Sequence, residues 1–146
     1  MLIDLKLINP STKVPAFSTP GSAGVDIHAH IEKEIALHPG NTALIPTGFA
    51  MAIPQGFAAL LIPRSGLGHK SGIVLGNLVG LIDEDYRGGV AVSVWNRQQS
   101  GMPFLIFPGD RIAQMVIVPI ARPTYRVVKE LPSTDRGDGG FGSTGV

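Results

Sequence analysis

Hydrophobic and polar residues alternate with a period of two in several short segments of the chain. The clearest is residues 90–95, in which valine occupies every second position. Similar alternation covers residues 3–7, 31–37 and 125–127. A period of two is typical of a β-strand with one face in the core and the other in solvent. We therefore predict strands at these four places.

Turn signals separate the apolar segments. His38–Asn41, Ile53–Gly56 and Phe107–Asp110 each carry proline second and glycine third or fourth, which is the chemistry of a tight turn. The chain has 12 prolines and 19 glycines, and these leave little room for a long helix. One or two helical turns fit around Ser65–Ser71. Many short strands between turns predict an all-β sandwich or barrel.

Size and charge narrow the class of protein. A chain of 146 residues fits one domain, and its net charge of +1 advertises neither a nucleic-acid nor a membrane surface. Without cysteine, disulfides and zinc–thiolate sites are excluded. The N-terminus has no apolar signal core, and the apolar runs are too short to span a bilayer. We expect a cytoplasmic protein that binds neither nucleic acid nor membrane.

The C-terminal segment differs from the rest. Residues 133–146 contain five glycines and one aromatic residue, so they cannot bury enough apolar area to offset their ordering entropy. We expect residues 1–132 to form a β-domain and residues 133–146 a flexible arm. Such a tail is either a plain linker or a lid whose ring stacks on a base. The side chains available to a lid are Arg136, Phe141, Ser143 and Thr144.

Two segments have the chemistry of an anion site. Pro63–Lys70 follows an apolar strand, and Arg64, Ser65 and Gly66 offer a guanidinium, a hydroxyl and free backbone N–H groups. The competing interpretation is an ordinary turn with a surface arginine. Gln114 interrupts an apolar strand, where its amide needs a partner, either a local backbone group or a phosphate.

Residues 76–96 are predicted to form a hairpin centred near Tyr86, with Leu81 opposite Ala91. Asp83 then lies where the first strand ends, as a turn former or as a general base beside the apolar strand. Asn77, within the first strand, either satisfies a neighbouring backbone group or presents its amide to a ligand.

A possible metal triad is formed by Asp26, His28 and His30, which alternate on one strand face. Zinc sites usually show tighter ligand sets, so solvent-facing histidines are the preferred interpretation.

Together these segments resemble the trimeric dUTP diphosphatase (dUTPase) family, closest to its bacterial members. The resemblance spans almost the whole chain. Five motifs carry it in order: Ala23-Gly-Val-Asp-Ile-His-Ala, Pro63-Arg-Ser-Gly-Leu-Gly, Gly80-Leu-Ile-Asp-Glu-Asp-Tyr-Arg-Gly, Gly109-Asp-Arg-Ile-Ala-Gln-Met and Arg136-Gly-Asp-Gly-Gly-Phe-Gly-Ser-Thr-Gly.

The resemblance implies a jelly-roll-like β fold and a homotrimer with three active sites at the subunit interfaces. It implies Mg²⁺-dependent hydrolysis of dUTP to dUMP and pyrophosphate, which lowers dUTP and supplies dUMP for thymidylate synthesis. Asp83 is implied to activate water for attack on the α-phosphorus and to meet the sugar 3′-hydroxyl. Tyr86 is implied to lie under the deoxyribose and leave no room for a 2′-hydroxyl.

The remaining roles also come from the resemblance. The resemblance implies that uracil is recognised by Asn77 and by the main chain of Leu81, Ile82 and Ala91. Phosphate contacts are implied for Arg64, Ser65, Gly66 and Gln114. Asp26 is implied to reach the triphosphate-bound Mg²⁺ through water. The arm is implied to cross to a neighbouring subunit, with Phe141 over the base and Arg136, Ser143 and Thr144 on the phosphates.

The motifs depart from the family pattern at two positions. His28 replaces an apolar residue, and Gly89 stands where glutamate or glutamine is common.

Three competing functions remain open. A deoxycytidine triphosphate deaminase shares the fold, but Asp83 with Tyr86 and the full arm favours the diphosphatase. A non-catalytic trimeric binding module would keep the nucleotide pocket without turnover. A structural jelly-roll protein gives no reason for Arg136 and Phe141 in a glycine tail.

Overall fold

The computed structural model describes residues 1–140 of the chain, and these form an almost entirely β structure with one short helix. The elements are β1 Asp4–Leu7, β2 Val25–His28, β3 Ile35–Leu37, β4 Thr42–Pro46, β5 Phe49–Ala52, β6 Phe57–Ile62, α1 Ser65–Ser71, β7 Ile73–Leu75, β8 Gly80–Ile82, β9 Ala91–Asn96, β10 Phe104–Ile106 and β11 Arg111–Pro119. The described residues contain no helix that is long and apolar enough to cross a membrane.

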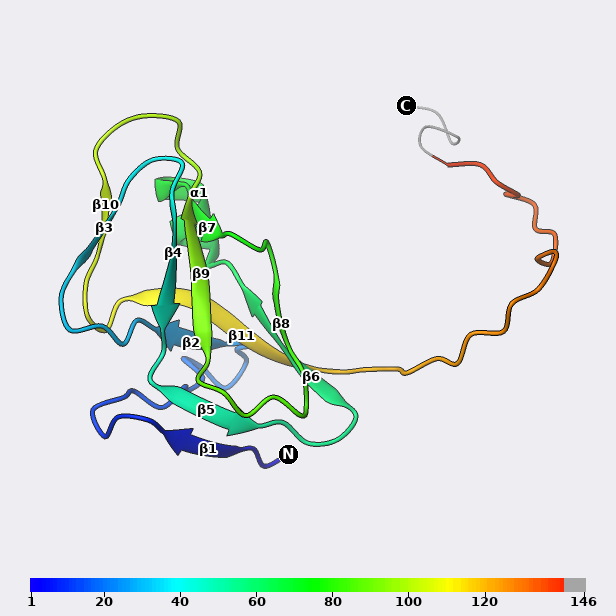
Figure 1. The fold of residues 1–146 in the computed structure, drawn as a ribbon, viewed down its shortest axis with the longest axis horizontal. Coiled ribbons are helices and arrows are strands. Elements are labelled where there is room, and N and C mark those ends of the chain that lie inside the picture. Colours follow the sequence, from blue (N-terminus) through cyan, green and yellow to red (C-terminus); the bar gives the residue numbers. More distant parts are fainter. Residues whose placement is uncertain (141–146) are drawn as a thin grey trace.

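The strands pair antiparallel in small sheets around a common core (Figure 1). One sheet has the order β2-β11-β6-β8 and another the order β4-β9-β7, while β1 pairs with β5 and β3 with β10. Non-consecutive neighbours in each sheet mean that the chain crosses repeatedly between sheets. The predicted all-β, jelly-roll-like fold is confirmed.

The alternation in residues 90–95 correctly predicted a core strand. Val90, Val92 and Val94 are at most 3% exposed. They belong to one hydrophobic cluster that also contains Ile27 from β2 and Phe49 from β5. Burying valine side chains of this kind stabilises the fold by about 1.5–3 kcal/mol each, so β9 contributes substantially to the common core.

The turns and the helix also form where the sequence predicted them. Gly40, Gly56 and Gly109 have φ of 78°, 82° and 82°, a backbone conformation that glycine adopts without strain. The helix α1 covers Ser65–Ser71 and ends at Gly72, whose φ of 67° closes it. The β6–α1–β7 connection is thereby fixed.

The predicted strand at residues 125–127 is wrong. After β11 the chain leaves the barrel in an extended segment without regular secondary structure (Figure 1). Tyr125 and Val127 are 86% and 97% exposed. Alternation predicts a strand only where another strand supplies backbone partners, and residues 1–140 supply none to this segment.

Candidate functional site

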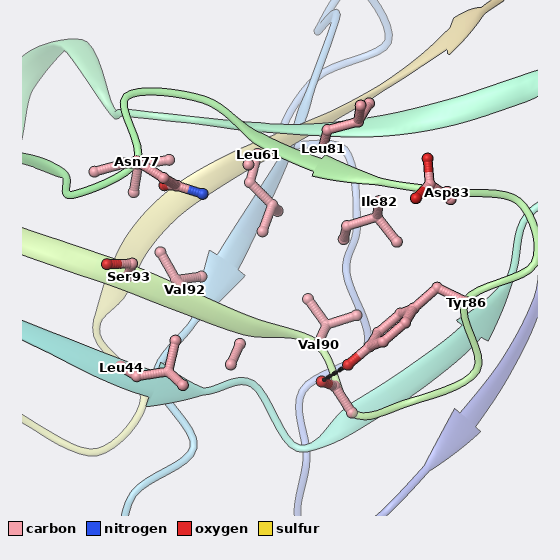
Figure 2. Close-up of a pocket in the computed structure, with 14 residues that line it drawn as sticks. Leu44, Leu61, Asn77, Leu81, Ile82, Asp83, Tyr86, Val90, Val92 and Ser93 are labelled. Atoms are coloured by element: carbon pink, nitrogen blue, oxygen red, sulfur yellow. Dashed lines mark hydrogen bonds between the residues drawn. The ribbon is translucent and has the colours of Figure 1, made fainter.

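A pocket of about 310 Å³ opens between β8 and β9 (Figure 2). Apolar side chains such as Leu61 and Val92 form its floor, and polar groups stand at its rim. A concave apolar cavity with few polar groups is the usual form of a small-molecule site. Six residues that were predicted from the sequence to bind or react line it: Asn77, Leu81, Ile82, Asp83, Tyr86 and Ala91.

The pocket exists because β8 and β9 do not pair with each other. Leu81 lies opposite Leu60 of β6, and Ala91 lies opposite Pro46 of β4. The predicted hairpin with Leu81 facing Ala91 is therefore wrong. Each strand pairs with a distant segment that buries its apolar face, so the two strands join different sheets and separate.

Asn77 lies in the turn between β7 and β8 and not within a strand as predicted. The turn forces Leu78 into a left-handed conformation with φ of 63°. It is held against β9 by the bond from the Gly76 N–H to the Ser93 carbonyl, at 2.8 Å. Figure 2 shows the Asn77 amide directed toward the pocket.

Asp83 follows the last residue of β8, at the rim of the pocket near Tyr86 (Figure 2). Its neighbour Ile82 is buried, whereas Asp83 is exposed. No hydrogen bond or ion pair among residues 1–140 occupies its carboxylate. The carboxylate is thus available to accept a proton from a water beside the pocket.

The ring of Tyr86 is fixed in place at the same rim. Its hydroxyl donates to the carbonyl of Gly89 at 3.1 Å. A Cβ at Gly88 would overlap that hydroxyl oxygen, so only glycine fits beneath the ring. The loop between β8 and β9 therefore presents one flat aromatic surface beside Asp83.

A second polar cluster lies on β2, β11 and the start of α1. The Nε of Arg64 donates to Asp26 Oδ1 at 3.0 Å, and Nη1 of Arg111 donates to Oδ2 at 3.2 Å. Burial alone raises the pKa of Asp26, but the hydrogen bonds and charges of the two arginines outweigh it and lower the pKa below its ordinary value. Arg111 was not predicted as a site residue. Arg111 could have been found from the sequence, because it lies in the same motif as Gln114.

The metal-triad interpretation of Asp26, His28 and His30 finds no support. No group of three or more metal-binding side chains occurs within residues 1–140, and both oxygens of Asp26 face arginines. His28 is half-buried and not solvent-exposed, and its Nδ1 has no hydrogen-bond partner. Burial, and then the charge of Lys13, lower the pKa of His28 below its ordinary value, so the imidazole is neutral at pH 7.

The other predicted phosphate contacts lie near this second cluster. Gln114 of β11 is half-buried and stands in register between Asp26 of β2 and Ile62 of β6. Ser65 and Gly66 form the first turn of α1, and a Cβ at Gly66 would meet open space. Backbone N–H groups of this turn are open to an approaching anion.

Within one chain, Asp83 at the pocket rim lies far from the second cluster around Asp26. Asp26 lies on β2, three strands from β8, and neighbouring strands are separated by about 4.8 Å, so about 14 Å lie between them across the sheet. The two clusters are also offset along the strands. Gln114, beside Asp26, pairs with Ile62 of β6, whereas Ile82, beside Asp83, pairs with Ala59. This offset of three to four residues separates Asp83 from Asp26 by about a further 10–13 Å. Within one chain, Asp83 is thus well separated from Asp26 and from Gln114 beside it.

Arg136 is the one predicted arm residue that the structure describes. It is exposed, and its Nε donates to the Gly139 carbonyl at 2.9 Å. Phe141, Ser143 and Thr144 lie outside the described residues.

Comparison with known proteins adds independent findings. The dUTPase family model matches residues 11–145. Curated relatives named deoxyuridine 5′-triphosphate nucleotidohydrolase include a Laribacter hongkongensis protein, 56% identical over 98% of this chain and 97% of its own. Another, from Burkholderia cenocepacia, is 51% identical over 99% of both chains.

Among solved structures, dUTPases also have a similar fold. The dUTPase of Staphylococcus bacteriophage 80alpha with dUPNHPP has a TM-score of 0.85 at 30% identity over 99% of both chains. A variant dUTPase from phage phi11 of S. aureus, described with a structural Mg(II) ion, has a TM-score of 0.79 at 27% identity. It covers 89% of this chain and 98% of its own.

Proposed function

The chain belongs to the dUTPase family, and from that premise we propose that it hydrolyses dUTP to dUMP and pyrophosphate by attack of an Asp83-activated water on the α-phosphorus. As a dUTP diphosphatase it lowers dUTP and supplies dUMP for thymidylate synthesis. The observation that carries the proposal is the free carboxylate of Asp83 at the rim of a base-sized pocket, beside the fixed ring of Tyr86.

Uracil occupies the pocket between the separated strands. Within residues 1–140, β8 pairs with β6 alone, so one row of its backbone donors and acceptors is unpaired. Leu81, Ile82 and Ala91 offer main-chain groups there, and Asn77 offers an amide. A buried set of donors and acceptors that matches uracil leaves groups unpaired with cytosine, which disfavours dCTP.

Tyr86 selects the sugar. Its ring lies under the deoxyribose and blocks the space that a 2′-hydroxyl needs. The bond from its hydroxyl to Gly89 and the close packing over Gly88 keep the ring from moving aside. UTP is therefore disfavoured by sterics, while the same loop brings Asp83 to the 3′-hydroxyl and the α-phosphorus.

The phosphates are held by the second cluster of a neighbouring subunit. Arg64, Ser65, Gly66 and Gln114 carry the donors. Within one chain they are well separated from Asp83, which supports a site that takes Asp83 from one chain and the phosphate donors from another. The homotrimer of the family provides three such shared sites.

Mg²⁺ fits this arrangement as a triphosphate-bound ion. Asp26 is the carboxylate of the second cluster, and its two oxygens already accept from Arg64 and Arg111. Each oxygen keeps a lone pair for a water, so Asp26 can orient a water of the ion without binding it directly. When bound, the ion neutralises negative charge on the phosphates.

The arm completes the site. We propose that residues 1–132 form the β-domain and residues 133–146 cross to a neighbouring subunit. There Phe141 covers the base and Arg136, Ser143 and Thr144 contact phosphates. Closure of such an arm expels water and completes the set of phosphate donors.

Pyrophosphate release tests the proposal directly. The wild type should turn over dUTP in the presence of Mg²⁺ and leave dTTP, dCTP and UTP largely untouched. Asp83→Asn should bind dUTP but lose at least about a hundredfold in kcat, as expected for a removed general base. Persistent turnover in Asp83→Asn would show that another group activates the water, and ammonia release from dCTP would identify a deaminase instead.

A further inference from the structure

Within the described chain, the polar contacts between the loop that carries Asp83 and Tyr86 and the rest of the barrel all use one side chain. Bonds within residues 83–89 close the loop on itself, such as the one from Tyr86 N–H to the Asp83 carbonyl at 3.2 Å. Among residues 1–140, every hydrogen bond or ion pair from this loop to another part of the chain uses the carboxylate of Glu84.

Glu84 reaches two separate segments. Its Oε2 accepts from the backbone N–H of Gly56 at 2.6 Å, and its Oε1 pairs with Nη2 of Arg122 at 3.0 Å. The Glu84 side chain is 19% exposed and Arg122 is 58% exposed. The bond to Gly56 is the better shielded one, because the ion pair faces solvent and exposed pairs contribute little.

The Gly56 backbone is a fixed anchor. It stands in the turn between β5 and β6, where its φ of 82° defines the turn. Its carbonyl accepts from the N–H of Ile120 at 2.9 Å, so the turn is also joined to the end of β11. A side chain bonded to this N–H is therefore held in a fixed position relative to the sheets and not relative to another loop.

We infer that Glu84 is a positioning residue: its carboxylate, bonded to the Gly56 N–H, fixes the loop so that Asp83 is aimed at the water behind the α-phosphorus. This inference rests on the proposed dUTP hydrolysis. The hydrogen bond from Gly56, followed by the ion pair with Arg122, lowers the pKa of Glu84, which keeps it an acceptor at neutral pH. A misplacement of about 1 Å in such a group costs on the order of a hundredfold in rate.

Side-chain length and charge can be separated at this position. Glu84→Gln keeps the length and an acceptor oxygen but removes the charge. Glu84→Asp keeps the charge but is one methylene too short to reach Gly56. We expect Glu84→Asp and Glu84→Ala to lower kcat for dUTP by about 10- to 100-fold with KM within threefold, and Glu84→Gln and Arg122→Ala to keep kcat within threefold.

The controls distinguish positioning from general damage. Glu32→Ala removes an exposed carboxylate that has no partner among the described residues and should leave kcat and KM unchanged. Each variant is assayed well below its own Tm and checked for oligomeric mass. If Glu84→Ala does not fold, the comparison of Glu84→Asp with Glu84→Gln decides. Equal rates for those two, or a normal kcat in Glu84→Asp, would overturn the inference, whereas a wild type without dUTP turnover would overturn the proposed function itself.

Discussion

At the scale of single residues, the Tyr86 ring packs so closely over position 88 that only glycine fits there. A Cβ at this position would overlap the Tyr86 hydroxyl oxygen and lie 2.6 Å from Cζ. Neither atom can yield without moving the ring, because the hydroxyl is bonded to the adjacent Gly89 carbonyl. The glycine thus sets the position of the Tyr86 ring, which we propose selects the sugar.

We therefore expect Gly88→Ala to lower kcat/KM for dUTP at least tenfold. We also expect the ratio of kcat/KM for dUTP to kcat/KM for UTP to fall, because the displaced ring no longer blocks the 2′-hydroxyl. Parallel pyrophosphate assays with the two substrates measure both effects. Gly21→Ala is the matched control, since a Cβ there meets nothing within 4 Å. An unchanged ratio of the two substrates in Gly88→Ala would mean that the ring does not read the sugar.

Asp26 carries a buried charge that stabilises the fold. It is 8% exposed and pairs with two arginines, so Asp26→Asn leaves Arg64 short of its partner. We expect a loss of about 2 kcal/mol in the free energy of unfolding at pH 7, below the 3–5 kcal/mol of fully buried pairs because both arginines are partly exposed.

The pH dependence of this loss follows from the lowered pKa of Asp26. Its contribution is fully present above the ordinary value of 3.8 and is lost as the pH falls through the lower folded value. Tm curves of wild type and Asp26→Asn should thus be separated at pH 5–7 and converge below pH 3.8. A constant separation down to the lowest pH would show that the carboxylate acts by shape and not by charge.

At the scale of elements, Asn96 joins β9 to the end of β3 and to the segment that follows β9. It is fully buried, and its Nδ2 donates to the Leu37 carbonyl at 3.0 Å while its Oδ1 accepts from the Gln98 N–H at 3.1 Å. Asn96→Ala removes both bonds, and of the two residues that lose a partner Leu37 is buried whereas Gln98 is exposed.

We expect Asn96→Ala to lower the free energy of unfolding by about 1–3 kcal/mol, the cost of an orphaned buried group such as the Leu37 carbonyl, since the N–H of the exposed Gln98 can bond to water. Urea unfolding at fixed protein concentration measures it. Gln98→Ala is the control. It removes only an exposed bond to Ser71 and should change stability by less than about 0.5 kcal/mol. Equal effects of the two substitutions would refute the role assigned to Asn96.

The sequence predicted elements with local signals and failed where pairing is long-range. The valine alternation located β9, and proline with glycine located the turns at Gly40, Gly56 and Gly109. The separation of β8 from β9 depends on β6 and β4, which no local pattern specifies. Residues 125–127 alternate like a strand but have no strand beside them in the described chain.

The same limit applied to the site. One motif contains Asp83 and Tyr86, and the Asn77 amide was singled out beside it; all three line one pocket, whatever the pairing of the strands. Sequence reasoning did not select Arg111, whose partner is 85 residues away, or Glu84, whose bond is to a backbone N–H that has no sequence signature. Chemistry carried by side-chain type is visible in a sequence, whereas positioning is not.

At the scale of the whole molecule, the proposed function requires that two chains share each site. Asp83 is level with Ala58 of β6, whereas Arg64 follows the end of that strand, so the two residues are up to about 20 Å apart along β6 within one chain. Homotrimers of Asp83→Asn or of Arg64→Ala should each be nearly inactive, because every site lacks one group.

Mixed trimers should recover activity. In a random 1:1 assembly of the two variants, about one site in four draws both wild-type groups from different chains, so about a quarter of wild-type turnover should return. Refolding the variants together and separately, followed by pyrophosphate assays, tests this. If mixing restores nothing, both groups serve the same chain's site and the shared-site arrangement fails.

The open edge of β8 has a further consequence for the free enzyme. Within residues 1–140 this row of main-chain groups has no strand beside it, and an extended peptide could pair with it, although β8 offers only three residues. Under the proposed function, a nucleobase that hydrogen-bonds to this row terminates the sheet, as a flanking strand would. The same few backbone atoms would then both recognise the substrate and be closed to peptide pairing while it is bound.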